Sequence, residues 1–255
     1  MITNTDPLNV VQATPSNYTV RVLESRPLTP TSHLLRLEKP AGYDFRVSQA
    51  TRLFLNTPSG IERHTLSMSS SPTRDYLEFA ARQTNSSWKQ TFFALALGDP
   101  INIQGPVGKF ILNQDYPGVL IAGGIGITPF KSMIEYATEM RLPIDFTLLY
   151  SSRTPDEIAF KAELDALASL NPHLKIIYTI TRKTHLPDWH GRIGRIDQEL
   201  LRQVSQTKPE ACYYICGTPS LIADSIQMLN SVGVTLDRIM LETFKGYALH
   251  ADNFR

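Results

Sequence analysis

Two glycine-rich segments have the composition of phosphate-binding turns. Residues 123–129 (Gly-Gly-Ile-Gly-Ile-Thr-Pro) follow the apolar run 119–122, and residues 216–219 (Cys-Gly-Thr-Pro) follow a second apolar run. Glycines at a strand end let the backbone approach a pyrophosphate, and the N-terminus of the next helix offers free N–H groups. A tight strand–helix turn without a ligand is the alternative. We expect a dinucleotide to contact Gly123, Gly124, Gly126, Thr128, Pro129, Gly217 and Pro219.

Basic side chains follow two further predicted strands. Ser152 and Arg153 come after the strand 144–150, and Arg182 and Lys183 come after the strand 174–181. An NAD site usually has Asp or Glu after its second strand to hold the ribose 2′-hydroxyl, whereas Arg accommodates a 2′-phosphate. We therefore expect these four residues to favour NADPH over NADH. Solvated surface cations are the alternative.

The elements that position these residues change in type at about residue 115. Before it, short apolar segments between Pro and Gly turns predict an antiparallel barrel with one helix near 87–97. After it, apolar runs alternate with helical periodicity, which predicts a doubly wound, five-stranded parallel sheet. The strands are expected at 119–122, 144–150, 174–181, 213–216 and 238–242, and the helices at 126–139, 155–168, 197–204 and 219–231.

One possible strand order would bring the two glycine-rich segments together. In an order 3-2-1-4-5, the first and fourth strands flank the crevice at which a doubly wound sheet binds its ligand. Both glycine turns would then face one dinucleotide. We divide the chain into a barrel domain at 1–115 and an α/β domain at 116–255.

The composition excludes several classes of function. The 255 residues carry 25 basic and 24 acidic side chains, a formal net charge of +1, so no overall charge attracts nucleic acid. We expect no membrane span and no secretory signal, and therefore a cytoplasmic protein. Cys212 and Cys216 lie about 13 Å apart if their segment is a strand, too far for a disulfide. The histidines show no metal-ligand spacing, so no metal site is expected.

Two further segments complete an ordered set of motifs. Residues 62–72 (Glu-Arg-His-Thr-Leu-Ser-Met-Ser-Ser-Ser-Pro) are rich in hydroxyl groups, and Arg82 precedes the Ser-Ser-Trp of 86–88. Together with Gly-Pro-Val-Gly-Lys-Phe (105–110), both glycine turns and Glu-Thr-Phe-Lys-Gly-Tyr (242–247), they resemble the ferredoxin–NADP⁺ reductase superfamily. The sequence looks most like its stand-alone flavodoxin/ferredoxin-reductase-like branch. Taken alone, the hydroxyl-rich segment is typical of an ordinary edge strand.

The resemblance implies a flavin in the barrel, FAD rather than FMN. The family pattern Arg-x-Tyr/Phe-Ser, aligned on residues 64–67, places Ser67 at the hydroxyl that faces flavin N5. His64 then stands at the arginine position and Leu66 at the aromatic position, two departures from the pattern. The flavin ligands that the resemblance implies are Arg63, His64, Thr65, Leu66, Arg82, Ser86, Ser87 and Trp88.

The resemblance also implies a nicotinamide site and a function. Cys216 would flank the nicotinamide, and Glu242 and Phe244 would line it; a strand-end carboxylate without a catalytic role is the alternative for Glu242. With Ser67, Cys216 and Glu242 form the expected catalytic set. The implied function is hydride transfer from NAD(P)H to FAD, with electrons passing to an acceptor such as ferredoxin or flavodoxin. The alternatives are a non-catalytic dinucleotide-binding regulatory protein and a reductase of small molecules, ferric chelates or free flavin.

Overall fold

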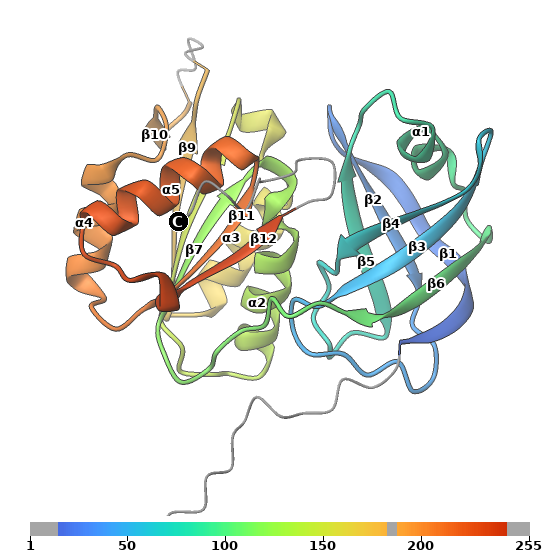
Figure 1. The fold of residues 1–255 in the computed structure, drawn as a ribbon, viewed down its shortest axis with the longest axis horizontal. Helices are drawn as coiled ribbons and strands as arrows, with labels where there is room; N and C mark the ends of the chain where they lie inside the picture. The colour runs from blue at the N-terminus through green and yellow to red at the C-terminus, as the bar shows by residue number, and fades with distance from the viewer. Residues whose placement is uncertain (1–14, 183–187, 244–255) are drawn as a thin grey trace, which may run out of the picture.

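The computed structural model describes residues 15–182 and 188–243, which form two β-sheets packed side by side (Figure 1). The first sheet is antiparallel, with six strands in the order β4-β3-β6-β1-β2-β5. Its strands are β1 (Ser16–Thr29), β2 (Ser32–Glu38), β3 (Ala50–Thr57), β4 (Gly60–Ser67), β5 (Tyr76–Arg82) and β6 (Pro100–Val107).

The first sheet curls around an apolar core but stays open along one side. Val20 and Val22 of β1 are buried with an exposed residue between them, so the predicted alternation is confirmed. Strands β4 and β5 form the two edges of the sheet. The predicted barrel is therefore a half-barrel with an opening between β4 and β5. Helix α1 (Ser87–Ala94) buries Trp88 and Phe92 in this core, and it ends three residues before the predicted end at Leu97.

The second sheet is parallel, in the order β10-β9-β8-β7-β11-β12. Its strands are β7 (Gly118–Gly123), β8 (Phe146–Ser152), β9 (Leu174–Ile180), β10 (Arg192–Ile193), β11 (Cys212–Gly217) and β12 (Ile239–Thr243). The predicted order of the five long strands is confirmed. The predicted strand number is wrong by one, because the two residues of β10 are too few to show any periodicity.

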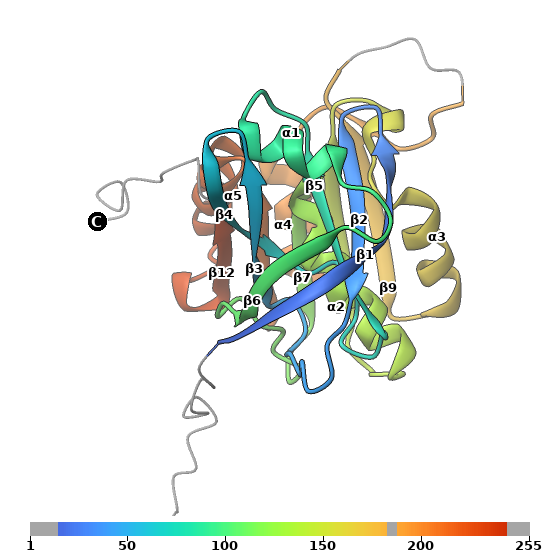
Figure 2. The same ribbon diagram turned by 90° about the vertical axis from the view of Figure 1, so that its right-hand side faces the viewer.

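Helices cover both faces of the parallel sheet, as Figure 1 and the turned view of Figure 2 show. Helix α2 (Thr128–Glu139) and α3 (Lys161–Leu170) pack on the face toward the half-barrel. Helix α4 (Gln198–Thr207) and α5 (Pro219–Ser231) pack on the other face. Short 3-10 segments lie at Gly124–Ile127, Pro155–Glu157 and Leu236–Arg238.

One predicted helix begins later than expected. The helix predicted at 155–168 starts only at Lys161, after a 3-10 turn and the left-handed residue Phe160 (φ +59°). An aromatic residue is costly in this conformation. Phe160 is only 3% exposed, so packing of its ring offsets the local cost.

A single apolar core joins the half-barrel to α2. Leu34 of β2 and Ala80 of β5 lie in the same cluster as Phe130, Met133 and Ile134 of α2. The strands of each sheet fall on opposite sides of residue 115, and the division into two domains there stays a prediction. Among the described residues, no helix has the length and apolarity to cross a membrane.

Candidate functional site

The two glycine-rich segments meet at the carboxyl edge of the parallel sheet. Strands β7 and β11 are neighbours, and their register pairs Ala122 with Cys216. The 3-10 turn at Gly124–Ile127 follows β7 directly, and α2 follows the turn. Pro129 lies in the first turn of α2, as predicted, where its missing N–H costs nothing. The two turns therefore lie side by side where strand order reverses.

Close packing between the two turns explains Gly126. A Cβ atom on Gly126 would lie 2.3 Å from the carbonyl oxygen of Cys216 and 2.9 Å from Cα of Gly217. Gly124 has a different requirement, because its φ of +52° is left-handed and no described atom lies within 4 Å of its Cβ position. Gly126 thus lets two backbones touch, and Gly124 turns the chain beside open space.

A buried tyrosine on β8 holds the first glycine turn. The hydroxyl of Tyr150 donates to the carbonyl oxygen of Gly124 (3.0 Å) and accepts from the N–H of Ala159 (3.1 Å). Burial raises the pKa of Tyr150, so its hydroxyl keeps its proton. The sequence pattern indicated Tyr150 only as a strand residue, because its partner at Gly124 is 26 residues away.

The predicted 2′-phosphate residues also meet at this edge. The N–H of Arg182 donates to the carbonyl oxygen of Arg153 (2.9 Å), so the ends of β8 and β9 stay paired beyond the strands. Both arginines are exposed, and neither makes a salt bridge within the described part of the chain. The Ser152 hydroxyl is buried without a hydrogen-bond partner there. Lys183 lies outside the described residues.

Strand alternation divides the predicted flavin residues of β4 between two faces. His64 and Leu66 point toward the core, and Arg63 and Thr65 are exposed on the opposite face. Leu66 is 7% exposed and belongs to the half-barrel core. Ser67 ends the strand and is 4% exposed.

Helix α1 begins at the opening of the half-barrel beside His64. The imidazole of His64 stacks on the indole of Trp88, with the ring centroids 4.3 Å apart. The hydroxyl of Ser86 caps the helix by accepting from the N–H of Lys89 (3.3 Å), and the hydroxyl of Ser87 donates to the carboxylate of Glu62. Both predicted serines are thus hydrogen-bonded within the chain. Arg82 lies nearby in sequence at the end of β5, the other edge strand.

Two donors near this helix start have no acceptor among the described residues. The indole N–H of Trp88 is buried without a hydrogen-bond partner. The ammonium of Lys89 lies over the rings of Trp88 (5.1 Å) and Phe92 (6.0 Å), and no described carboxylate forms a salt bridge with it. Burial lowers the pKa of Lys89 to about 8. Burial, followed by the charge of Lys89, also lowers the pKa of His64.

Sequence reasoning missed Lys89, although a signal was present. A cation in the first turn of a helix opposes the helix dipole, which favours anions at that end. Lysine directly after the predicted Ser-Ser-Trp helix start therefore indicates a nearby negative charge. Within the described residues, no salt bridge supplies that charge, so the position is available to an anionic ligand.

The expected nicotinamide residues lie at the same carboxyl edge. Register pairs Cys216 of β11 with Glu242 of β12. Burial raises the pKa of Glu242 to about 7 and raises that of the fully buried Cys216 thiol well above its usual value. A contact between Cys216 and a nicotinamide stays a prediction. Phe244 lies outside the described residues.

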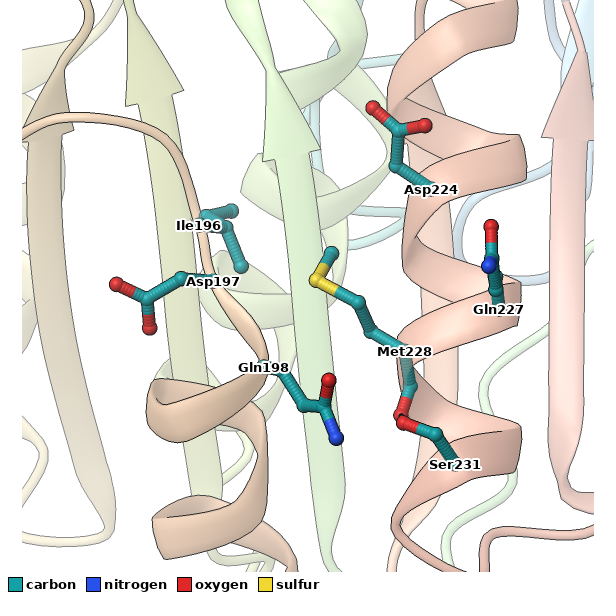
Figure 3. A pocket seen from close by; sticks show the side chains of 7 residues that line it. All are labelled: Ile196, Asp197, Gln198, Asp224, Gln227, Met228 and Ser231. Atoms are coloured by element: carbon teal, nitrogen blue, oxygen red, sulfur yellow. Dashed lines mark hydrogen bonds between the residues drawn. The ribbon is translucent and has the colours of Figure 1, made fainter.

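A hollow of about 390 Å³ lies elsewhere, between α4 and α5 on the face away from the half-barrel (Figure 3). Its lining includes Asp197, Gln198, Asp224 and Met228. None of the predicted site residues lines it. No group of three or more potential metal ligands occurs among residues 15–182 and 188–243.

Comparison with known proteins shows a matching domain family and a shared fold. The family profile described as an oxidoreductase NAD-binding domain matches residues 120–227, which contain both glycine turns. The crystal structure of a ferredoxin NADP⁺ reductase from Neisseria gonorrhoeae with bound FAD and NADP covers 89% of this chain and 98% of its own, with a TM-score of 0.77 and 24% identity. Residues 120–227 thus match the NAD-binding domain family, and the chain has the fold of this ferredoxin NADP⁺ reductase. The predicted resemblance and fold class are thus confirmed.

Two curated relatives are named as parts of reductase systems. One component of the Na⁺-translocating NADH-quinone reductase of Methylococcus capsulatus is 33% identical over 159 residues, 60% of this chain and 39% of that protein. The reductase component of a propane 2-monooxygenase from Rhodococcus jostii is 25% identical over 234 residues, 88% of this chain and 62% of that protein. The chain therefore spans less than two thirds of either relative.

Proposed function

We propose that this chain is a flavin-dependent NAD(P)H oxidoreductase that passes electrons to an acceptor protein. One observation carries the proposal: the predicted flavin and nucleotide segments are in direct contact across the two sheets. The 3-10 turn at Gly124–Ile127 contacts β5, an edge of the half-barrel opening. Ser70, three residues after Ser67, accepts a hydrogen bond from Ser132 of α2 at its carbonyl oxygen (2.7 Å). Hydride transfer depends mostly on such positioning of two rings.

The nucleotide half of the site fits a dinucleotide phosphate. Open space at Gly124 admits a pyrophosphate to the backbone, and no described side chain caps the N-terminus of α2 in competition for its N–H groups. The exposed guanidinium groups of Arg153 and Arg182 suit a 2′-phosphate at the neighbouring strand ends. These features favour NADPH over NADH as the nucleotide.

The flavin half fits a phosphate group next to α1. The buried indole N–H of Trp88 lacks an acceptor, and Lys89 lacks a carboxylate among the described residues. The ammonium of Lys89 would be satisfied by the pyrophosphate of FAD, with Arg82 on the edge strand β5 as a further cation. Lys89 can thereby take over the charge that arginine supplies at the His64 position of the family pattern. Leu66 is a core residue here, so it offers no aromatic ring.

The residues of the chain would orient two rings and keep water away from them. Bound FAD would supply the redox chemistry, by accepting a hydride from the nicotinamide. Ser67 would donate a hydrogen bond to the flavin ring from its buried position at the end of β4. Glu242 would line the nicotinamide side, and its raised pKa gives it a protonated fraction near neutral pH. Cys216 would support this edge from beneath.

The acceptor is proposed from the relatives. A reductase component serves a partner in a larger system, and the propane 2-monooxygenase reductase component aligns over most of this chain. We propose a small carrier protein, such as a ferredoxin or flavodoxin, or an oxygenase component as the acceptor. Turnover with ferric chelates or free flavin at the rate seen with a protein acceptor would instead favour a small-molecule reductase.

An anaerobic visible spectrum tests the proposed function. Purified protein, reconstituted with FAD or FMN and freed of excess flavin, is recorded before and after NADPH and then before and after NADH. We expect flavin bands that NADPH bleaches faster than NADH. A protein that stays colourless after reconstitution would refute the flavin enzyme and favour the regulatory protein. Bands that neither nucleotide bleaches would refute NAD(P)H as the donor.

A further inference from the structure

A buried ion network joins α2 to the half-barrel directly behind the proposed site. Lys131 of α2 is 1% exposed, and its ammonium lies 2.9 Å from the carboxylate of Glu78 on β5, which is 0% exposed. Glu78 also accepts from Arg36 of β2 at 2.8 Å. Lys131 contacts Glu135 and Glu163 as well, each at 3.4 Å. Neither the flavin motif nor the nucleotide motif accounts for these charges.

The same helix face holds the serine segment 69–71, which begins two residues after Ser67. Glu135 accepts from the N–H of Ser71 at 2.7 Å, and its other oxygen accepts from Arg74 at 2.8 Å. The hydroxyl of Ser69 donates to Glu78 at 2.9 Å. The segment is therefore clamped between β5 and α2.

The contacts of Glu78 and Glu135 with the serine segment 69–71, together with Lys131, form a clamp. This clamp links the two halves of the proposed site. Lys131 lies in the first turn of α2, immediately after the glycine turn at Gly124–Ile127. Glu78, its partner, holds the segment that leads back to Ser67. A displacement of Lys131 would thus shift the glycine turn relative to Ser67. A change of about 1 Å in such a geometry can lower a rate about 100-fold.

Lys131 and Glu78 each favour the charged form of the other in the interior. Burial disfavours the charge of Lys131, but Glu78, Glu135 and Glu163 outweigh burial and raise its pKa. Burial likewise disfavours the charge of Glu78, yet Lys131 and Arg36 lower its pKa. The short distance between Lys131 and Glu78 and their burial are what a positioning function requires.

We infer that Lys131 is a positioning residue for hydride transfer, which sets the glycine turn of the nucleotide site against the Ser67 end of β4. The inference rests on the proposed function, because it assigns Lys131 a part in that reaction. Lys131 itself would touch neither the flavin ring nor the nicotinamide ring. Its effect passes through Glu78 and the serine segment on one side and through α2 on the other.

The variant Lys131→Met separates positioning from binding. Methionine keeps much of the volume and removes the charge, while Glu78 retains Arg36 and Glu135 retains Arg74 as partners. In anaerobic stopped-flow reduction, we expect the limiting rate constant to fall at least about tenfold. We expect the Kd for the nucleotide to change less than about threefold, because the turn itself is intact. Hydrogen exchange at residues 69–71 should become faster.

Lys161→Met is the matched control, since Lys161 pairs with Asp165 within α3 and its side chain is 42% exposed. The inference would be overturned if the limiting rate constant of Lys131→Met stayed within twofold of that of the unsubstituted protein. It would also be overturned if Lys161→Met lowered that rate constant as much as Lys131→Met does. If Lys131→Met does not fold, Ser132→Ala decides. It removes the hydrogen bond to the carbonyl oxygen of Ser70 and the one accepted from the N–H of Ser48. It must lower the same rate constant without weakening nucleotide binding.

Hydrogen exchange distinguishes failure of this inference from failure of the proposed function. Unsubstituted protein that binds no flavin, or that NAD(P)H does not reduce, refutes the function. The clamp is then tested alone by exchange at 69–71 in Lys131→Met against Lys161→Met. Equal exchange in the two variants would overturn the clamp as well.

Discussion

Alanine at position 126 should drive the two glycine turns apart. The added Cβ would lie 2.3 Å from the carbonyl oxygen of Cys216, whereas ordinary contact begins at 3.4 Å. The obstacle is backbone, so no side-chain rotation relieves it. One turn must move by about 1 Å relative to the other, at the edge where the dinucleotide is proposed to bind.

The displacement sets the size of the expected effect. Overpacking of this kind costs about 1–3 kcal/mol of stability. A shift of about 1 Å in a positioned group can lower a reaction rate about 100-fold. We therefore expect Gly126→Ala to raise the Kd for NADP⁺ by about 10- to 100-fold. We also expect it to lower Tm by several degrees, about 2–4 °C for each kcal/mol in a chain of this size.

Titration calorimetry with NADP⁺ and thermal unfolding measure the two effects. Gly118→Ala is the control. Gly118 begins β7, at the end of this strand opposite the glycine turn, and a Cβ there would lie 2.7 Å from the ring of Phe146. It should lower Tm similarly while leaving the Kd within about twofold. Unchanged nucleotide affinity in Gly126→Ala would refute the assignment of the turns as the nucleotide site.

Three further predictions concern charged groups. Replacing both Arg153 and Arg182 by alanine should raise the KM for NADPH at least about tenfold, because charge-assisted hydrogen bonds to its 2′-phosphate are lost. The KM for NADH should stay within about twofold. An equal rise in both KM values would exclude a 2′-phosphate site at these arginines. Lys89→Met should weaken FAD binding about 10- to 100-fold in a fluorescence titration. The affinity of the unsubstituted protein for FAD should fall as the pH rises past about 8, because Lys89 of the flavin-free protein loses its proton there. An affinity for FAD that does not depend on pH would contradict this assignment. Burial raises the pKa of Glu242 from 4.5 to about 7. Between these pH values the unfolded chain ionises Glu242 and the folded protein does not, so the free energy of unfolding should fall as the pH rises from 4.5 to about 7. That loss is at most about 3 kcal/mol, and Glu242→Gln should flatten the matching fall in Tm between pH 5 and 8.

Much of the nucleotide half could be predicted because its signals are local. Glycine, proline and apolar residues at fixed offsets specify a strand, a turn and a helix start within about ten residues. The order 3-2-1-4-5, under which both glycine turns would face one crevice, is the order that the five long strands have. The short strand β10 and the late start of α3 escaped prediction, since neither has a periodic signal.

The flavin half was less predictable because its geometry depends on distant contacts. The pattern placed His64, Leu66 and Ser67 on one strand, but only the tertiary structure shows His64 stacked on Trp88, 24 residues later. Leu66 is a core residue for the same reason: its neighbours come from other strands. The flavin and catalytic assignments stay predictions, and Lys183 and Phe244 lie outside the described residues.

By itself, the sequence determined the alternation of elements, the two glycine turns and the cations after the second and third parallel strands. These depend on periodicity and short-range chain geometry, which a linear pattern contains. Only the tertiary structure decided that Lys131 is buried among Glu78, Glu135 and Glu163. A charge is stable in the interior only when its partners are present, and those partners come from β5, α2 and α3, up to 53 residues away. No local pattern specifies that meeting, because packing of the two sheets creates it.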